Sequence, residues 1–202
     1  MRYVAELPSG LAFCCRLMLT LITVLPMAGA LSPSPVCADE KSSPAKMTLE
    51  IEINRPQNAV RGYRRPYVAA WLADKDGFPV RTISLWVQQA PPGERWVPDL
   101  RQWYRDDRVR QLVDDLNLVD AVSSATRNAG KHKVAWDGND DNGKPLPAGT
   151  YTLIVESARE HGTYQIIREK LELGAKAFQR DLKGNAEISA VRVNYVGQKS
   201  SR

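Results

Sequence analysis

Apolar and polar residues alternate in one stretch of the chain and form nearly unbroken apolar runs in two others. At 47–54 the apolar positions are Met47, Leu49, Ile51 and Ile53, with polar residues between them. This period of two predicts a strand with one buried face. The runs 66–73 and 80–87 flank the turn sequence 74–77, which ends in glycine. Two apolar runs around such a turn predict a β-hairpin.

The period changes in the middle of the chain. Between 99 and 117 the apolar residues recur every three or four positions, at Leu100, Trp103, Tyr104, Val109, Leu112, Val113 and Leu116. This spacing predicts one amphipathic helix whose apolar stripe packs on the sheet. We expect Asp99 to cap its first amides and Asn117 to end it.

Strand patterns return in the C-terminal half. Runs at 131–136, 150–158, 164–173 and 187–196 are separated by clusters of Gly, Asn and Pro. With the three runs before the helix they make about seven strands. The sequence therefore predicts an all-β fold, an immunoglobulin-like β-sandwich with one helical insertion.

The N-terminus has the pattern of a secretory signal peptide. Arg2 and Arg16 precede an apolar run at 17–30, and a Pro/Ser stretch leads to Ala38. We expect cleavage after Ala38, with Ala30 as the alternative. The predicted organisation is a signal peptide at 1–38, a linker at 39–46 and the β-sandwich at 47–198. We therefore expect the protein to be exported to the periplasm.

The composition argues against several classes of function. All three cysteines lie within the predicted signal peptide, so the mature chain would offer no thiol for catalysis, a disulfide or zinc. The net charge of +5 is too small to indicate nucleic-acid binding. The two histidines, His132 and His161, stand in no hydrolase or metalloprotease motif, and we expect His161 in a turn. The sequence favours a carrier or accessory protein over an enzyme.

Arginines and aromatic residues are interleaved in two places. The first group is Arg61, Tyr63, Arg64, Arg65 and Tyr67, and the second is Arg101, Trp103, Tyr104, Arg105, Arg108 and Arg110. Such groups suit anionic ligands, but surface arginines more often belong to a solvated face, which is the interpretation adopted here.

The segment 136–151, WDGNDDNGKPLPAGTY, resembles the signature of the immunoglobulin-like domain in flagellar hook-capping proteins. Its Asp, Asn, Gly and Pro residues predict a hairpin loop. Asp137, Asn139 and Asp141 alternate as in a calcium loop. The glycine then comes one position late, at Gly143, and Ala148 stands where a bidentate Glu is needed, so we predict no metal site.

A second motif, DAVSSAT at 120–126, resembles the flavin-attachment sequence D-x-x-S/T-G-A-T/S of FMN-binding subunits in Rnf and sodium-translocating NADH:quinone reductase complexes. The resemblance rests on Asp120, Ser123, Ala125 and Thr126, whereas Ser124 replaces the usual glycine. It implies that a flavin transferase joins FMN through its phosphate to Thr126.

Neighbouring residues extend this hypothesis. Ser123 and Arg127 are candidate contacts of the FMN phosphate, and Trp103 or Tyr104 is a candidate neighbour of the flavin ring. The alternative is that 120–126 is a polar loop leaving the helix, with its hydroxyls satisfying local backbone groups.

A wider resemblance covers most of the mature chain. It is carried by the runs at 65–86, 96–105, 119–127, 136–153 and 155–165, which are similar to the predicted periplasmic family called domain of unknown function 2271. The resemblance implies export, and a flavin transferase and a PepSY-type membrane reductase as partners. Two hypotheses result: a redox carrier with covalent FMN, or a non-catalytic immunoglobulin-like binding or assembly module of the cell envelope.

Overall fold

The structure is a computed structural model that describes residues 47–55, 63–114, 117–160 and 162–198. All of these residues belong to the unit Asp39–Arg202. The predicted signal peptide, the whole predicted linker and His161 lie outside the described residues.

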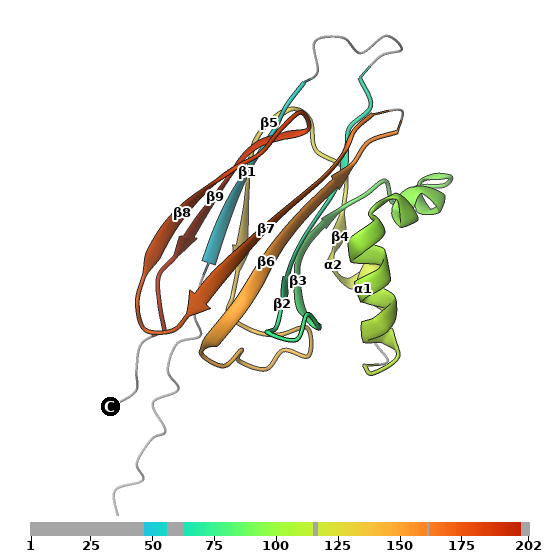
Figure 1. The fold of residues 1–202 in the computed structure, drawn as a ribbon. Helices are drawn as coiled ribbons and strands as arrows, with labels where there is room; N and C mark the ends of the chain where they lie inside the picture. Colours follow the sequence, from blue (N-terminus) through green and yellow to red (C-terminus); the bar gives the residue numbers. More distant parts are fainter. Residues whose placement is uncertain (1–46, 56–62, 115–116, 161, 199–202) are drawn as a thin grey trace, which may run out of the picture. The chain divides into compact units, whose positions relative to one another are not determined.

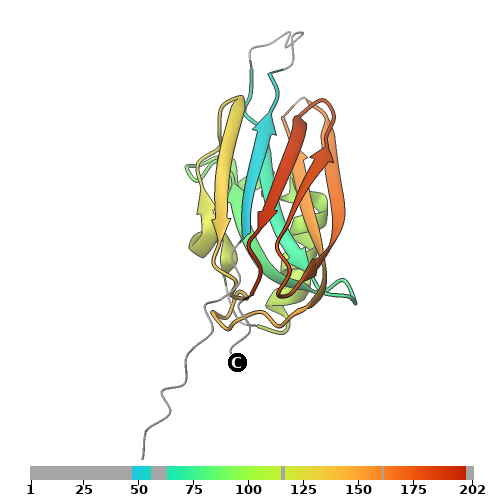
Figure 2. The same cartoon turned by 90° about the vertical axis from the view of Figure 1, so that its left-hand side faces the viewer.

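Two β-sheets pack face to face (Figures 1 and 2). The four-stranded sheet, which faces the viewer in Figure 2, has the order β5-β1-β9-β8, and the five-stranded sheet has the order β4-β3-β2-β6-β7. The bounds are β1 Met47–Ile53, β2 Tyr67–Ala73, β3 Pro79–Trp86, β4 Ser123–Ser124, β5 Gly130–Trp136, β6 Gly149–Ala158, β7 Tyr164–Leu173, β8 Phe178–Lys183 and β9 Ile188–Tyr195. The all-β sandwich is thus confirmed, with nine strands among the described residues in place of about seven.

The main core lies between the two sheets. Strand β1 alternates buried and half-buried residues as its sequence predicts, and Leu49 pairs with Val134 of β5 and Val193 of β9. Leu49, with Ile51 beside it on the buried face, is fully enclosed by side chains of the facing sheet. Each such side chain contributes roughly 1.5–3 kcal/mol through removal of apolar surface from water.

A second core covers the outer face of the five-stranded sheet. It joins outward-facing residues of β2, β3 and β6 to a helical layer inserted between β3 and β4, and its fully enclosed members include Ala69, Trp71, Leu85 and Leu100. Every residue of β2 is therefore buried, which explains why its sequence is an apolar run and not an alternation. The predicted hairpin is confirmed, because β2 and β3 pair antiparallel.

The helical layer differs from the single predicted helix. It consists of the 3₁₀ helix η1 Gly93–Asp99, the helix α1 Arg101–Gln111 and the short helix α2 Leu118–Val122 (Figure 1). The predicted end at Asn117 is wrong because α1 stops at Gln111. Leu112, the residue after it, is 87% exposed, so the apolar stripe packs on the sheet only near its start.

The predicted Asp99 cap is also wrong. Asp99 is the last residue of η1, and the residue before α1 is Leu100, which makes no side-chain capping bond. The Glu156 carboxylate of β6 takes this role instead. It accepts hydrogen bonds from the backbone N–H groups of Gln102 (2.9 Å) and Trp103 (2.7 Å). An acid from the sheet therefore fixes where the helix begins.

Among the described residues, no helix has the length and apolar character needed to cross a membrane.

Candidate functional site

The motif 120–126 begins in a helix and ends in a loop at the sheet edge. Asp120 lies in α2, which ends at Val122, and Ser123–Ser124 then form β4, which pairs in parallel with Leu85 and Trp86 of β3. The N–H of Val87 donates to the Ser124 carbonyl at 2.9 Å. After this bridge the chain leaves the sheet.

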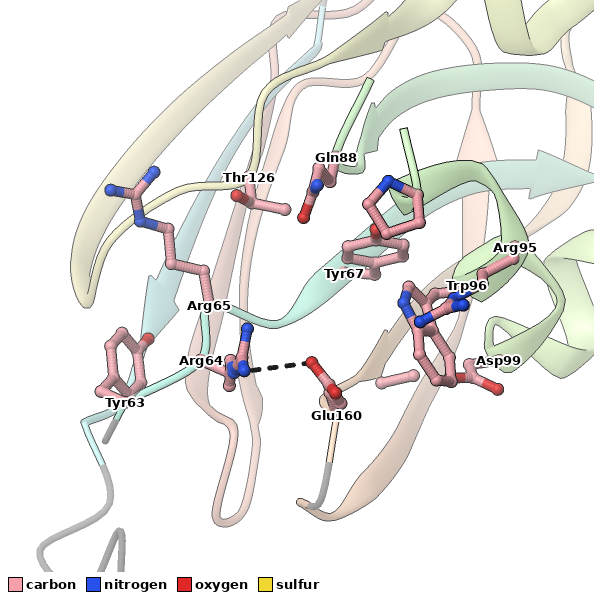
Figure 3. A pocket seen from close by; sticks show the side chains of 12 residues that line it. Tyr63, Arg64, Arg65, Tyr67, Gln88, Arg95, Trp96, Asp99, Thr126 and Glu160 are labelled. Atoms are coloured by element: carbon pink, nitrogen blue, oxygen red, sulfur yellow. Dashed lines mark ion pairs between the residues drawn. The ribbon is translucent and has the colours of Figure 1, made fainter. Parts of the chain in front are cut away.

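Thr126 is half-buried and lies in the wall of a pocket of about 450 Å³ (Figure 3). We call it the Thr126 pocket. Its lining is Tyr63, Arg64, Arg65, Tyr67, Gln88, Pro92, Arg95, Trp96, Asp99, Thr126, Ala158 and Glu160. Pockets of roughly 300–1,000 Å³ are typical of small-molecule and cofactor sites.

One side of the Thr126 pocket is aromatic. Trp96 belongs to η1 and has the Arg95 guanidinium over its ring, 4.7 Å from the ring centroid. Tyr67, at the start of β2, is almost fully buried, and its hydroxyl donates to the Gly93 carbonyl at 2.9 Å. This hydrogen bond ties η1 to the sheet and so holds the aromatic wall in place. Burial raises the pKa of Tyr67, which keeps it a neutral donor.

The other side of the Thr126 pocket is charged. Arg64 and Arg65 precede β2, and the Arg64 Nε lies 3.5 Å from the Glu160 Oε2. The Arg64 side chain is 65% exposed, so this ion pair is weak and Arg64 keeps access to an anion. Burial raises the pKa of the neighbouring Tyr63, and the negative charge of Glu187 adds to the shift. The side therefore offers cationic and neutral phenolic groups.

The structure separates Thr126 from the other polar residues of the motif. Asp120 and Ser123 line a neighbouring pocket of about 560 Å³. The Asp120 carboxylate accepts from the Asn117 side-chain amide at 2.9 Å, and the Ser123 carbonyl accepts from the Gln89 amide at 3.1 Å. Ala125, between the two parts of the motif, is exposed.

The predicted neighbours of the flavin also lie elsewhere. The Arg127 guanidinium lies over the ring of Trp86 at 5.8 Å from its centroid, outside the lining of the Thr126 pocket. Trp103 is 1% exposed and its indole N–H donates to Thr82 at 3.3 Å, so this residue belongs to the second core. Tyr104 lines the neighbouring pocket.

The sequence pattern predicted that the first arginine–tyrosine group lies on a solvated face. In the structure, Tyr63, Arg64, Arg65 and Tyr67 all line the Thr126 pocket. The interleaving of arginine and tyrosine residues was the sequence signal that could have indicated a binding site here. Trp96 carried none, because its position opposite Thr126 depends on the path of η1.

The acidic loop 137–144 uses its carboxylates within the fold. Asp137 accepts from the Asn139 N–H at 3.1 Å, and Asp140 accepts from the Asn142 N–H at 2.9 Å. Asp141 accepts from the N–H of Thr82 on β3 at 3.0 Å. No group of three or more His, Cys, Asp or Glu side chains suited to a metal ion occurs in the described part of the chain.

Comparison with known proteins identifies the family. The sequence model of DUF2271, described as a predicted periplasmic protein, matches residues 48–190. The chain belongs to the DUF2271 family. No curated protein matches the sequence.

Two solved structures are similar to this DUF2271 protein at low identity. A C2 domain matches with 7% identity and a TM-score of 0.32, covering 77% of this chain and 99% of its own. Truncated FlgD from the human pathogen Helicobacter pylori matches with 13% identity and a TM-score of 0.31, covering 79% of this chain and 87% of its own. These scores are too low to carry an argument about function.

Proposed function

We propose that this DUF2271 protein is a periplasmic redox carrier with FMN attached through its phosphate to the Thr126 hydroxyl. A flavin transferase makes the attachment, and a PepSY-type membrane reductase exchanges electrons with the carrier. The attached flavin supplies the electron-transfer chemistry, while the protein anchors and surrounds it.

One observation carries the proposal: the residue that the motif marks for attachment lies in the wall of a pocket with aromatic and cationic lining. Phosphate is held by arginine through charge-assisted hydrogen bonds, and flat apolar rings pack on aromatic side chains. The residues present therefore fit the chemistry of FMN. Asp120 and Ser123 lie outside this pocket, so their role would be in recognition by the transferase.

In the proposed attachment reaction, FAD donates the FMN group. The Thr126 Oγ attacks the phosphorus atom that is attached to the ribityl chain of FAD. The pyrophosphate P–O bond breaks, AMP leaves with the bridging oxygen, and the hydroxyl proton passes to a base of the transferase. The half-buried Thr126 lies in a loop outside the strands, where a modifying enzyme has access.

The test is co-expression with a periplasmic flavin transferase, followed by denaturation, intact-mass measurement and in-gel flavin fluorescence. The wild-type protein should gain the mass of one FMN less one water. Thr126→Ser should retain the adduct because a hydroxyl remains, whereas Thr126→Ala should lose it.

Ser124→Ala serves as the matched control, since it removes the hydroxyl of the motif residue two positions before Thr126, at the end of β4, and should leave the adduct intact. An unmodified wild-type mass with a demonstrably active transferase would reject the carrier and leave the non-catalytic binding module as the better account.

A further inference from the structure

We infer that the Thr126 pocket seats the whole flavin, with the phosphate near Arg64 and Arg65 and the ring system against Trp96. The inference rests on the proposed function, but it concerns where the flavin lies and not whether the bond to Thr126 forms. It assigns binding roles to residues outside the attachment motif.

The pocket has an arginine side near Thr126 and an indole side at Trp96, where the Arg95 guanidinium lies over the ring. In Figure 3, Thr126 and Arg65 lie on one side of the hollow, and Trp96 with Arg95 lies on the opposite side. FMN has the same polarity, because its phosphate and its ring stand at opposite ends of a ribityl chain. A phosphate on Thr126 therefore directs the ring across the pocket and toward Trp96.

The charges at the phosphate end favour an anion. Arg64 and Arg65 have exposed side chains, and the carboxylate facing Arg64 is Glu160 at 3.5 Å. Phosphate oxygens offer a guanidinium shorter and better-aligned hydrogen bonds than this long ion pair does. Binding of a phosphate would thus replace a weak contact with a stronger one. Glu160 competes for Arg64, so its removal should strengthen the binding of phosphorylated ligands.

The ring end is rigid and partly apolar. Trp96 is half-buried in η1, and Pro92 and Tyr67 line the pocket beside it. The hydrogen bond from Tyr67 to Gly93 fixes the start of η1, so the indole is positioned before a ligand arrives. Preorganised aromatic surface binds a planar ring with little loss of side-chain entropy.

The experiment titrates free FMN and free riboflavin into the protein made without a transferase, with flavin fluorescence as the readout. Riboflavin has the same ring and ribityl chain but no phosphate. We expect FMN to bind about tenfold or more tightly than riboflavin, the ratio that a charge-assisted phosphate contact supplies. The double variant Arg64→Gln/Arg65→Gln should erase this ratio without weakening riboflavin.

Trp96→Leu should weaken both flavins about three- to tenfold, as expected for loss of an aromatic pair. Glu160→Gln should increase the ratio. Arg180→Gln is the control, since Arg180 lies on β8 in the other sheet, beside Phe178. It should change neither affinity.

Equal affinity for FMN and riboflavin, or no binding of either at millimolar concentration, would overturn the inference. So would an Arg64→Gln/Arg65→Gln protein that keeps the wild-type ratio. Because these two arginines have exposed side chains, this variant should fold even if Trp96→Leu does not. The outcome is separate from the mass test: an adduct without pocket binding rejects only this inference, and pocket binding without an adduct rejects only covalent attachment.

Discussion

Replacement of Glu156 tests how the helical layer is held on the sheet. Glu156 is fully buried on β6, and its two carboxylate oxygens accept from the N–H groups of Gln102 and Trp103 at 2.9 and 2.7 Å. Glu156→Ala leaves both amides without this acceptor beneath the first turn of α1. The helix start and the 3₁₀ helix that runs into it would lose their anchor.

The magnitude follows from the two hydrogen bonds. Loss of an ordinary N-cap costs about 0.5–2 kcal/mol, and a hydrogen bond to a charged group contributes about 1.5–3 kcal/mol. The negative charge at the helix N-terminus adds stabilisation, while desolvation of the carboxylate offsets part of the total. We therefore expect Glu156→Ala to lower the free energy of unfolding by about 3 kcal/mol, or the Tm by about 6–12 °C. Glu156→Gln keeps one acceptor oxygen and should lose about half as much.

The assay is urea unfolding followed by tryptophan fluorescence, with Glu172→Ala as the matched control. Glu172 is an exposed residue of the neighbouring strand β7 that bonds only the Thr150 hydroxyl among the interactions described, so its loss should stay within about 0.5 kcal/mol. A Glu156→Ala protein as stable as this control would refute the reasoning that the carboxylate caps α1.

Three further predictions concern other parts of the sandwich. Burial raises the pKa of Asp141 from 3.8 to about 6, so its protonated form favours the folded state; this contribution is complete below about pH 4 and lost as the pH rises through 6. Asp141→Asn should reduce the fall in the free energy of unfolding between pH 4 and 7 by up to about 3 kcal/mol, as measured by denaturant unfolding at each pH. Leu100→Ala should cost about 2–5 kcal/mol because Leu100 is fully buried, whereas Leu112→Ala should cost less than about 0.5 kcal/mol at 87% exposure; chemical denaturation compares the two. Glu187→Ala should cost about 3–5 kcal/mol, since it leaves the mostly buried Arg159 without its 2.9 Å partner, and equal Tm values for variant and wild type would contradict this expectation.

The sequence predicted those parts of the fold in which local pattern and burial agree. Strand β1 alternates because one face is buried, and β2 and β3 flank a turn closed by Gly77 at a φ of +86°. Strand β8 was missed because it is an edge strand with mainly exposed residues, so its sequence has no period. The helix boundaries were wrong because the capping acid, Glu156, comes from 53 residues away along the chain and no local motif marks it.

The candidate site was predictable only as far as the motif extends. The motif singles out Thr126 as the candidate attachment residue, but the pocket that Thr126 lines is built by segments from four separate parts of the chain. Arg64 and Arg65 were interpreted as ordinary surface charge. No local sequence pattern shows that η1 packs on the outer face of the sheet and forms the opposite wall of the pocket. Arg127 was adjacent in sequence, yet its side chain packs on Trp86, since β4 fixes the direction in which the loop leaves the sheet.

The parallel bridge between β4 and β3 limits how far anything bound to Thr126 can travel. Thr126 stands two residues beyond Ser124, whose carbonyl is held by Val87, and two extended residues span at most about 7 Å. On the other side, the Asn128 carbonyl is bonded to the His132 ring at 2.7 Å. These two hydrogen bonds leave the loop only a short free length, so Thr126 can move only a few ångströms from the sheet edge. If FMN is attached at Thr126 as proposed, a redox partner would have to come to this edge of the sandwich itself, and the surface around the loop, more than the loop's own motion, would govern the rate of exchange.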